Sequence, residues 1–167
     1  TKRRWVKEAF AALESAGYTV GSGYTAVKDP SKSKFIYRDA LWGGADLLGL
    51  GVASFSHAAG VHYQNLTEID DYTAAIKAGE MPTKRSFRTT EEQRMIREFI
   101  LRMKLGRVDA GHFRSKYGVD VLARWEDELN ELTEEGLLTV VGKDIVLERD
   151  GLLCVDNILH DFFLPEH

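Results

Sequence analysis

Cysteine is almost missing from this chain, and its scarcity limits the chemistry that the chain can carry out alone. Cys154 is the only cysteine among 167 residues, so an internal disulfide bond and any all-cysteine zinc or iron-sulfur site are excluded. A single thiol in an apolar helical pattern is typical of a small core residue. The same scarcity fits a reducing compartment, and we therefore expect a cytoplasmic protein.

Long apolar runs are also missing. No stretch reaches the roughly 20 apolar residues that a membrane-spanning helix requires, so we expect no membrane span. Arg3 and Arg4 are not followed by the apolar segment of a secretion signal. The chain starts at Thr1 rather than at Met and passes directly into a helical pattern. We therefore expect it to be a piece of a longer protein.

Short catalytic and nucleotide-binding motifs are missing as well. The sequence contains neither a P-loop nor a dinucleotide G-x-G-x-x-G turn, and no Ser-His-Asp order indicates a hydrolase. His57 and His62 lie five positions apart without a carboxylate at the usual metal-ligand spacing. We therefore predict no metal site. Of the two histidines, we favour His57 as a cavity residue because it directly follows a glycine-containing apolar segment.

What remains is the composition of a globular protein, and residues 45–56 are its most informative stretch. The chain is 44% hydrophobic and 29% charged, and its length allows one substantial core. A nearly continuous apolar run at 45–56 predicts a strand covered on both faces. Gly49 and Gly51 remove two side chains from one face, just before Ser54 and Ser56. Such glycines mark either a bulge with tight packing or an edge that a ligand approaches.

The N-terminal segments predict a parallel α/β arrangement. We expect a helix at Lys2–Ser15 ended by Gly17, a strand at residues 18–27, a polar connector at 28–34 and the buried strand at 45–56. Helices and connectors that alternate with strands in this way are the units of a parallel barrel or sheet. Active sites of such folds lie beyond the C-terminal ends of the strands, here residues 24–27 and 54–57.

The chain after Asn65 predicts a second, mostly helical part. We expect a helix at 68–79, a hinge at 80–85, helices at about 89–105, 109–117 and 121–135, a hairpin at 137–148 and a last helix at 152–163. Three helices followed by a hairpin are typical of a winged helix, a common DNA-binding fold. The third helix carries six acidic residues between positions 126 and 135 and a single Arg124, so phosphate would repel it. We therefore predict no nucleic-acid binding.

One family resembles this chain in residues 46–56 (Asp-Leu-Leu-Gly-Leu-Gly-Val-Ala-Ser-Phe-Ser), followed at a fixed distance by Gln64 and Asn65. These residues resemble the late barrel strand and following loop of the oxygen-independent coproporphyrinogen III oxidase family of radical S-adenosylmethionine (SAM) proteins. The resemblance continues through Tyr72 and residues 97–102, 113–118, 129–138 and 152–163. It covers essentially all of this chain but only the back part of the family's chain. The family's C-x-x-x-C-x-x-C motif has no counterpart here.

The resemblance implies a fold of the class α/β plus α+β. It implies the last part of a parallel (α/β) radical SAM barrel at residues 1–65, a connecting helix and hinge at 66–88, and a winged-helix-like domain at 89–167. A barrel cut in this way leaves strand edges open, with unpaired backbone groups beside apolar side chains. We therefore expect the fragment to self-associate through residues 18–27 or 45–56.

The resemblance also implies a chemistry. In the family, a [4Fe-4S] cluster reduces SAM to a 5′-deoxyadenosyl radical, which abstracts hydrogen from a tetrapyrrole propionate before oxidative decarboxylation. The full-length protein would thus use SAM and [4Fe-4S] on a tetrapyrrole substrate. For this fragment alone we expect no cofactor, no catalytic residue and no metal ligand. A haem-binding, haem-delivery or anaerobic haem-modifying protein on the same scaffold is the alternative.

Site residues follow from the same resemblance. Phe55 falls on a SAM contact of the last barrel strand, with Gly49, Gly51 and Ser54 beside it. Most oxidases have a smaller aliphatic residue at the position of Phe55, which puts a second SAM site in doubt. Tyr24 and Thr25 stand where a more polar, acidic or histidine-bearing pair is usual. The expected substrate-binding residues are Tyr24, Arg38, Trp42, His57, Gln64 and Asn65.

Arg38 and Trp42 belong to an aromatic segment at residues 35–42, which the two glycines Gly43 and Gly44 end. A guanidinium pairs with carboxylates and an indole stacks on flat rings, and a porphyrin-like substrate offers both. Alternatively, Tyr37, Arg38 and Trp42 cover the bottom of the sheet.

Overall fold

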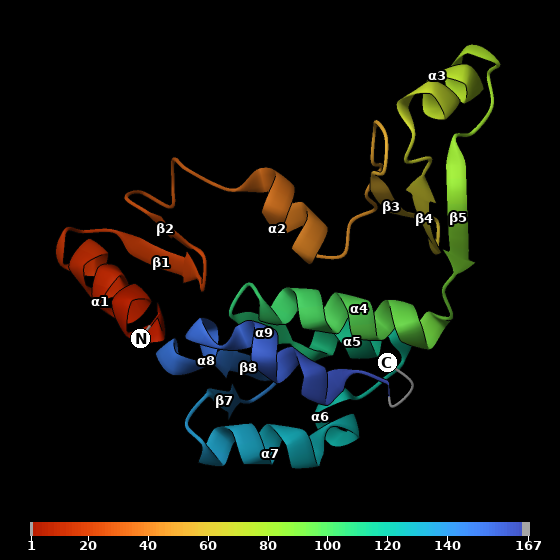
Figure 1. The fold of residues 1–167 in the computed structure, drawn as a ribbon. Coiled ribbons are helices and arrows are strands. Elements are labelled where there is room, and N and C mark those ends of the chain that lie inside the picture. The colour runs from red at the N-terminus through yellow and green to blue at the C-terminus, as the bar shows by residue number, and fades with distance from the viewer. Residues whose placement is uncertain (1, 165–167) are drawn as a thin grey trace. The chain divides into compact units, whose positions relative to one another are not determined.

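The computed structural model describes residues 2–164, and its contacts divide the chain into two compact units. One unit joins Thr1–Gly44 to Met95–His167 and is called the helical unit here. The other, Ala45–Arg94, is called the middle unit. Each is described by itself (Figure 1). The predicted division at residues 65/66 and 88/89 differs from these units and stays a prediction.

The helical unit begins with α1 (Lys2–Ser15), whose bounds confirm the prediction, and Gly17 follows it with a positive φ of 83°. The predicted single strand at residues 18–27 is wrong. The chain forms an antiparallel hairpin of β1 (Thr19–Ser22) and β2 (Thr25–Val27) instead. Its turn is built locally, because the backbone N–H of Tyr24 donates to Ser22 Oγ over 3.2 Å. Such a serine turn reverses the direction of the chain. The alternation of apolar and polar residues does not predict where such a turn occurs.

Helix α2 (Ile36–Trp42) follows, and the rest of the helical unit surrounds a small sheet (Figure 1). The sheet has the order β6 (Arg107–Asp109), β8 (Asp144–Leu147) and β7 (Leu138–Val141), and both of its ladders are antiparallel. The predicted hairpin at 137–148 is confirmed by β7 and β8. The remaining elements are α4 (Glu91–Met103), β6 (Arg107–Asp109), α5 (Ala110–Tyr117), α6 (Val121–Arg124), α7 (Glu126–Glu134), β7 (Leu138–Val141), β8 (Asp144–Leu147), α8 (Arg149–Leu153), α9 (Val155–Ile158) and the 3-10 helix η1 (Leu159–Phe162).

An aromatic cluster forms the centre of the core of the helical unit. The ring of Phe99 lies 4.3 Å from Trp125, 5.1 Å from Phe162 and 5.5 Å from Phe113, measured between centroids. Trp125 also interrupts the helix predicted at 121–135, because its φ of −118° and ψ of 39° are not helical. The last predicted helix is likewise broken, at Cys154. In both places the backbone departs from the helix while its apolar side chains remain packed in the core.

Side-chain hydrogen bonds cap the starts of three helices, α4 at the edge of the middle unit and α5 and α6 in the helical unit. Thr90 and Gln93 form reciprocal hydrogen bonds of 3.1 and 2.9 Å between side chain and backbone at the start of α4. Asp109 and Asp120 accept hydrogen bonds from the first backbone N–H groups of α5 and α6. Gly118 ends α5 with a positive φ of 68°. These caps explain why the helical boundaries could be predicted closely.

The middle unit contains a three-stranded antiparallel sheet with the order β3-β4-β5. Its strands are β3 (Phe55–Ala58), β4 (Val61–Asn65) and β5 (Thr83–Arg88), and α3 (Ile69–Lys77) connects β4 to β5. Helix α3 confirms the helix predicted at 68–79. The predicted hinge at 80–85 is wrong from Thr83 onward, because those residues pair with β4 as a strand.

The buried strand predicted at residues 45–56 is also wrong. Only its last two residues lie in β3, and most of the stretch is a loop in which the side chain of Leu50 is 80% exposed. Gly51 and Ala53 have positive φ values of 91° and 57°, which a regular strand does not allow. The apolar run does not form a strand because these backbone angles, which hydrophobicity does not encode, break the extended conformation.

Parallel strand pairing, expected for a barrel remnant, is not found between residues 2 and 164, where every ladder is antiparallel. The two segments that were predicted as barrel strands fold back onto their own neighbours instead. Because β1 is paired with β2, and β3 with β4, the expected self-association loses part of its physical basis and stays a prediction. Within the same residues, no helix has the length and apolar character needed to cross a bilayer.

Candidate functional site

The predicted cofactor loop of the middle unit is held by one buried side chain. Asn65 Nδ2 donates to the carbonyl oxygens of Gly49 and Gly51 over 3.1 and 2.9 Å. The backbone N–H of Asn65 donates to the carbonyl of Ser54 over 2.9 Å. Only 4% of Asn65 is exposed, so these bonds are shielded from water. Asn65, predicted to bind substrate, thus supports the glycine-containing loop.

Both glycines of this loop are required by the chain itself. A Cβ atom on Gly49 would lie 2.3 Å from the carbonyl oxygen of Phe55, which is far inside a van der Waals contact. Gly51 has the positive φ already described, and its N–H donates to Tyr72 Oη over 3.1 Å. Ser54 Oγ donates to the Leu50 carbonyl over 2.7 Å. The loop geometry accounts for Gly49, Gly51 and Ser54 without a ligand, and their cofactor role stays a prediction.

One face of the β3-β4-β5 sheet carries a pocket. The register places Phe55 opposite Gln64 and Gln64 opposite Arg85, with His62 opposite Phe87 in the next row. Alternate residues of a strand share a face, so these five side chains lie on the same side of the sheet. The pocket has a volume of about 310 Å³ and is lined by Phe55, His62, Tyr63, Gln64, Arg85, Ser86 and Phe87.

Ring stacking and hydrogen bonds among the side chains of this pocket fix their positions. The rings of Phe55 and His62 are stacked, with 5.6 Å between centroids and 18° between planes. The guanidinium of Arg85 lies 5.9 Å from the centre of the Phe55 ring, and its Nε donates to Gln64 Oε1 over 2.9 Å. Gln64 Nε2 in turn donates to the Ala53 carbonyl over 3.2 Å. The result is a partly apolar surface with a positioned cation.

Five of the seven residues that line this pocket, Tyr63 and Ser86 among them, were not predicted as site residues. His62 was considered only as a metal ligand, Arg85 was assigned to a hinge, and Phe87 was not considered. The available signal was the alternation of Arg85 and Phe87 next to Thr83, which is compatible with a strand. His57, in contrast, is buried, and its ring centroid lies 6.0 Å from that of His62.

The helical unit brings together the other predicted substrate residues, Tyr24, Arg38 and Trp42. The rings of Tyr24 and Trp42 meet edge to face at 5.7 Å, and the Arg38 guanidinium lies 5.4 Å from the Trp42 ring centre. Arg38 Nη1 donates to Ser22 Oγ over 3.2 Å and to Thr25 Oγ1 over 2.5 Å. The hairpin that replaces the predicted strand therefore fixes the guanidinium of Arg38, whose Nε and Nη2 also donate to Asp39 Oδ1 over 2.8 and 2.6 Å.

The Tyr24 hydroxyl is committed to a carboxylate. It donates to Asp156 Oδ2 over 2.5 Å, and Lys104 Nζ lies 2.7 Å from Asp156 Oδ1. Burial and the hydrogen bond to Asp156 raise the pKa of Tyr24, so the phenol is neutral over the physiological range. Hydrogen bonds from Lys104 and Tyr24 lower the pKa of Asp156. Tyr24 is consequently a donor and an aromatic surface rather than a general base.

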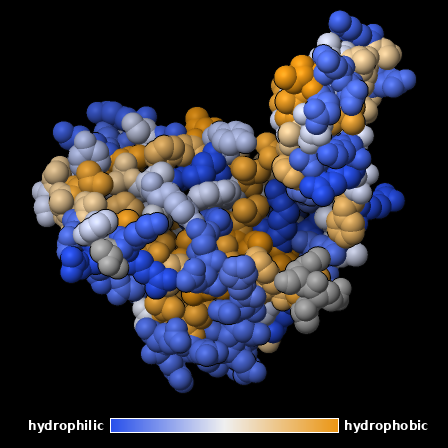
Figure 2. All heavy atoms as spheres, in the orientation of Figure 1, coloured by the Kyte–Doolittle hydropathy of each residue, from blue (hydrophilic) through white to orange (hydrophobic). Residues whose placement is uncertain are grey.

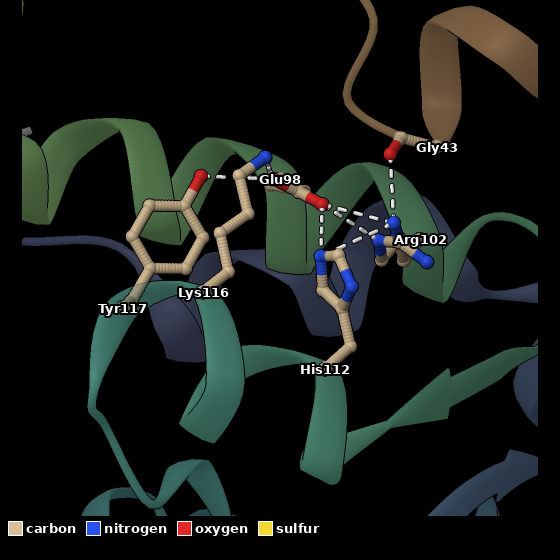
Figure 3. Close-up of polar contacts among 6 residues, drawn as sticks. All are labelled: Gly43, Glu98, Arg102, His112, Lys116 and Tyr117. Atoms are coloured by element: carbon tan, nitrogen blue, oxygen red, sulfur yellow. Dashed lines mark hydrogen bonds and ion pairs between the residues drawn. The ribbon is translucent and has the colours of Figure 1, made fainter.

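A buried carboxylate, Glu98, collects four polar side chains in the helical unit (Figure 3). Arg102 and His112 contact its Oε1 over 2.9 and 2.6 Å. Lys116 and Tyr117 donate to Oε2 over 2.6 and 2.8 Å. Burial raises the pKa of the Glu98 carboxyl, but the hydrogen bonds from Lys116, Tyr117 and His112 outweigh it and lower the pKa to about 2. Glu98 is therefore an anion at any physiological pH.

This Glu98 cluster (Glu98, Arg102, His112, Lys116 and Tyr117) also fixes the end of α2. Arg102 Nη2 donates to the carbonyl of Gly43 over 2.8 Å, as Figure 3 shows. Gly44 lies so close to Glu98 that an added Cβ would be 2.6 Å from its carboxyl carbon. The cluster thereby positions the helix that carries Arg38 and Trp42. The sequence signal for it was a glutamate beside Phe99 on the apolar stripe of α4.

The predicted site residues thus fall into two groups, one in each unit. The group in the helical unit consists of Tyr24, Arg38 and Trp42. The group in the middle unit consists of Gly49, Gly51, Ser54, Phe55, His57, Gln64 and Asn65.

Comparisons with known proteins bear on the identity of these groups. No protein-family model matches the chain. A curated relative, the oxygen-independent coproporphyrinogen III oxidase of Pseudomonas aeruginosa, is 26% identical over 132 residues, which are 74% of this chain and 28% of the relative. A solved structure, coproporphyrinogen III oxidase (HemN) from Escherichia coli, described as a radical SAM enzyme, aligns with a TM-score of 0.69 at 20% identity. That alignment covers 93% of this chain and 39% of the enzyme.

The chain therefore spans about a third of the length of these two proteins. The structural likeness shows a shared fold, and the curated relative carries the name of the family that residues 46–56, Gln64 and Asn65 resemble. The predicted resemblance is confirmed: over most of its length, this chain is similar to part of an oxygen-independent coproporphyrinogen III oxidase, a radical SAM enzyme.

Proposed function

We propose that this chain is the C-terminal portion of a radical SAM enzyme of tetrapyrrole metabolism. An oxygen-independent coproporphyrinogen III oxidase carries out the oxidative decarboxylation of the propionates of coproporphyrinogen III. The single observation that carries the proposal is the likeness to coproporphyrinogen III oxidases along most of the chain, in sequence and in fold. The resemblance of residues 46–56 with Gln64 and Asn65 supports it from the sequence alone.

The [4Fe-4S] cluster of such an enzyme would have to be held outside this chain. Three or four cysteine thiolates hold such clusters, whereas this chain has Cys154 alone. Its Sγ donates to the Asp150 carbonyl over 3.1 Å, and burial raises the pKa of the thiol. This donor set does not fit the cluster. In the proposed enzyme, the cluster and most SAM contacts belong to the part of the enzyme outside this chain, and the SAM contact of Phe55 stays a prediction.

The role of the present chain is then to shape and orient the substrate site. Arg38 is fixed by Ser22 and Thr25 and is paired with Asp39 through Nε and Nη2, and in this proposal a substrate propionate takes the place of the Asp39 carboxylate. Trp42 and Tyr24 supply aromatic edges and faces for a flat ring. The Glu98 cluster keeps the end of α2 in place. SAM and the cluster supply the radical chemistry, and these side chains bind and orient.

The segment from α4 to η1 serves as an accessory domain in this proposal. The order helix, strand, helices and hairpin, with the sheet order β6-β8-β7, supports a winged-helix-like domain. Its helix α7 presents a hydrophilic outer face in Figure 2, and that face is acidic: Glu126, Asp127, Glu128, Glu131 and Glu134. Acidic side chains disfavour contact with phosphate. We propose a cytoplasmic enzyme that does not bind nucleic acid.

The proposal is tested on the full-length protein of the parent gene. Its upstream sequence is expected to contain the three-cysteine motif, and the purified protein is expected to decarboxylate coproporphyrinogen III anaerobically with SAM. In Arg38→Gln, the loss of a charge-assisted hydrogen bond is expected to raise KM for the porphyrinogen about 10-fold or more. Lys32→Gln, in the exposed connector, is the matched loss of charge and is expected to leave KM unchanged. A parent protein without the motif would refute the assignment.

A haem-binding protein on the same scaffold is the second candidate, and one observation favours it. His62 is exposed and stacked on Phe55 in the sheet-face pocket, where its imidazole can reach the iron of a haem. This alternative predicts a shifted Soret band when the chain is titrated with haemin, and loss of that band in His62→Ala. The radical SAM proposal predicts no bond from His62 to iron, so any loss of affinity in His62→Ala should be the same for haemin and for metal-free coproporphyrin III.

A further inference from the structure

The sheet-face pocket of the middle unit contains cationic and aromatic groups for which the proposed function gives no role. Arg85, His62 and Phe87 line it together with Phe55. Phe55 and Phe87 are both about half exposed, at 46% and 54%, although aromatic rings of this size are usually more buried in a folded protein. Two exposed aromatic rings beside a positioned guanidinium are a surface suited to a ligand.

The charge of the sheet narrows the class of ligand. On the pocket face β5 contributes Arg85, because Lys84 and Arg88 alternate with it and lie on the opposite face. The sequences of β3, β4 and β5 contain no aspartate or glutamate. A surface with a cation and without acids favours an anion and disfavours a ligand that carries a positive charge. SAM carries a sulfonium and an ammonium group against a single carboxylate. A flat ring with several carboxylates complements this surface better.

Arg85 is prepared for such a carboxylate. Its Nε is held by Gln64 Oε1, and the face of its guanidinium lies over Phe55. Among the described residues, neither of its Nη groups has a hydrogen-bond partner. A guanidinium that is oriented through Nε can still bind a carboxylate through its Nη groups. Because the side chain is already ordered, it loses little conformational entropy on binding. The stacked pair of Phe55 and His62 lies beside it, where a ring attached to that carboxylate would rest.

We propose that this pocket binds one ring of a polycarboxylated planar ligand, with Arg85 binding a carboxylate and with Phe55, His62 and Phe87 packing against the ring. The volume of about 310 Å³ accommodates one ring and its side chain rather than a whole tetrapyrrole. The inference rests on the proposed function for the identity of the ligand, a tetrapyrrole. It adds a carboxylate subsite that is separate from Arg38 and that determines which ring substituents are accepted.

The test measures binding by this chain in the absence of SAM and iron. Coproporphyrin III, a stable tetracarboxylate, is titrated into the wild-type chain, Arg85→Gln and Lys84→Gln, and its Soret absorption and the quenching of tryptophan fluorescence are recorded. Loss of a charge-assisted hydrogen bond is expected to weaken binding about 10-fold or more in Arg85→Gln. Lys84 lies on the same strand but does not line the pocket. Lys84→Gln therefore removes the same charge and is expected to change Kd less than about 3-fold, by long-range electrostatics alone.

Further variants separate the ring from the carboxylate. Phe87→Ala is expected to weaken binding without changing its dependence on salt, whereas Arg85→Gln is expected to reduce that dependence. Arg85→Lys, which keeps the charge but loses the fork of donors, is expected to recover part of the affinity. Circular dichroism and hydrogen exchange of the β5 amides check that each variant retains the sheet.

Three outcomes would overturn the inference: no binding of coproporphyrin III by the wild-type chain, equal binding by wild type and Arg85→Gln, or tighter binding of SAM than of coproporphyrin III with dependence on Arg85. The last would assign the pocket to SAM. These failures are distinguishable from failure of the proposed function. The proposed function is refuted if the full-length protein lacks the cysteine motif or does not decarboxylate coproporphyrinogen III, and the binding experiment measures neither.

Discussion

The interior of each unit is stabilised by a different kind of interaction. The helical unit buries its large apolar side chains, and Phe99 and Phe113 are fully inaccessible to solvent. In the middle unit, the buried side chains include the polar groups Ser56, His57 and Asn65, while large apolar residues such as Leu50 are exposed. Apolar burial therefore supplies most of the stabilisation of the helical unit, whereas the middle unit relies more on its buried hydrogen bonds.

This difference matters for function because the candidate binding groups lie where apolar packing is weakest. Exposed aromatic side chains that no core requires, such as Phe55 and Phe87, are free to serve a ligand. The helical unit shows the opposite arrangement. Its central aromatic rings are buried in the core, and its polar Glu98 cluster fixes a helix end. The comparison can be tested one interaction at a time.

The largest effect is expected from Phe99→Ala. Its ring contacts Phe113, Trp125 and Phe162, so its removal leaves a cavity in the core of the helical unit and is expected to lower the free energy of unfolding by about 4 kcal/mol. Urea denaturation followed by tryptophan fluorescence measures it. The control is Leu50→Ala in the middle unit, expected to cost less than about 0.5 kcal/mol because Leu50 is exposed. Equal costs would contradict the contrast between the units.

Glu98→Gln is expected to have the next largest effect. The amide removes the negative charge while Lys116, Arg102 and His112 still face that position, and we expect a loss of about 3 kcal/mol in the free energy of unfolding. Glu134→Gln at the exposed end of α7 is the matched change and is expected to be nearly neutral. If the two variants unfold at the same urea concentration, the Glu98 cluster does not stabilise the unit.

The pH dependence of stability provides an independent measure of the same carboxylate. The pKa of Glu98 is lowered from 4.5 to about 2, so its contribution is fully present above about pH 4.5 and is lost as the pH falls toward 2. The shift corresponds to about 3 kcal/mol. Urea melts of wild type and Glu98→Gln between pH 5 and pH 2.5 should converge as the pH falls. Asp109, Asp120 and Asp156 titrate in both proteins and cancel in the comparison, so parallel curves would speak against this assignment.

A smaller and local effect is expected from Gly49→Ala. The new Cβ would collide with the Phe55 carbonyl, and relieving that contact is expected to cost about 2 kcal/mol within the middle unit. Gly21→Ala is the control, because its Cβ would lie 3.8 Å from Thr25 Oγ1, an ordinary contact. Hydrogen exchange of the Ala53 and Asn65 amides, both bonded to loop or strand carbonyls, reports the local opening. Unchanged exchange in Gly49→Ala would show that the loop can relax around a side chain.

Helices could be predicted from this sequence far better than strands. The bounds of α1 and the capped start of α4 follow from apolar periodicity and capping residues, which act within one or two turns. The strands at 18–27 and 45–56 were wrong because a serine turn at Ser22 and left-handed backbone at Gly51 and Ala53 decide the chain direction there. Hydrophobic periodicity indicates which face of an element is apolar, but it does not predict such backbone angles.

The candidate site was predicted in part for the same reason. Tyr24, Arg38 and Trp42 were named because of their chemistry, and the structure places them together, although on a hairpin and helix rather than at the end of a barrel strand. Arg85 was not named, because only the pairing of β5 with β4 brings it beside Gln64. Residues 21 positions apart give no local sign of contact. Glu98 escaped notice because one charged residue within an apolar stripe is usually read as exposed.

The connection between β4 and β5 determines where related sequences can tolerate insertions and deletions. Seventeen residues, 66–82, separate the two strands and include all of α3. Insertions or deletions there alter the length of a connection that begins and ends at the same place on the sheet. A deletion of one residue inside Thr83–Arg88 would instead turn every following side chain to the opposite face. We therefore expect related sequences to vary in length around α3 while they preserve the spacing from Thr83 to Arg88.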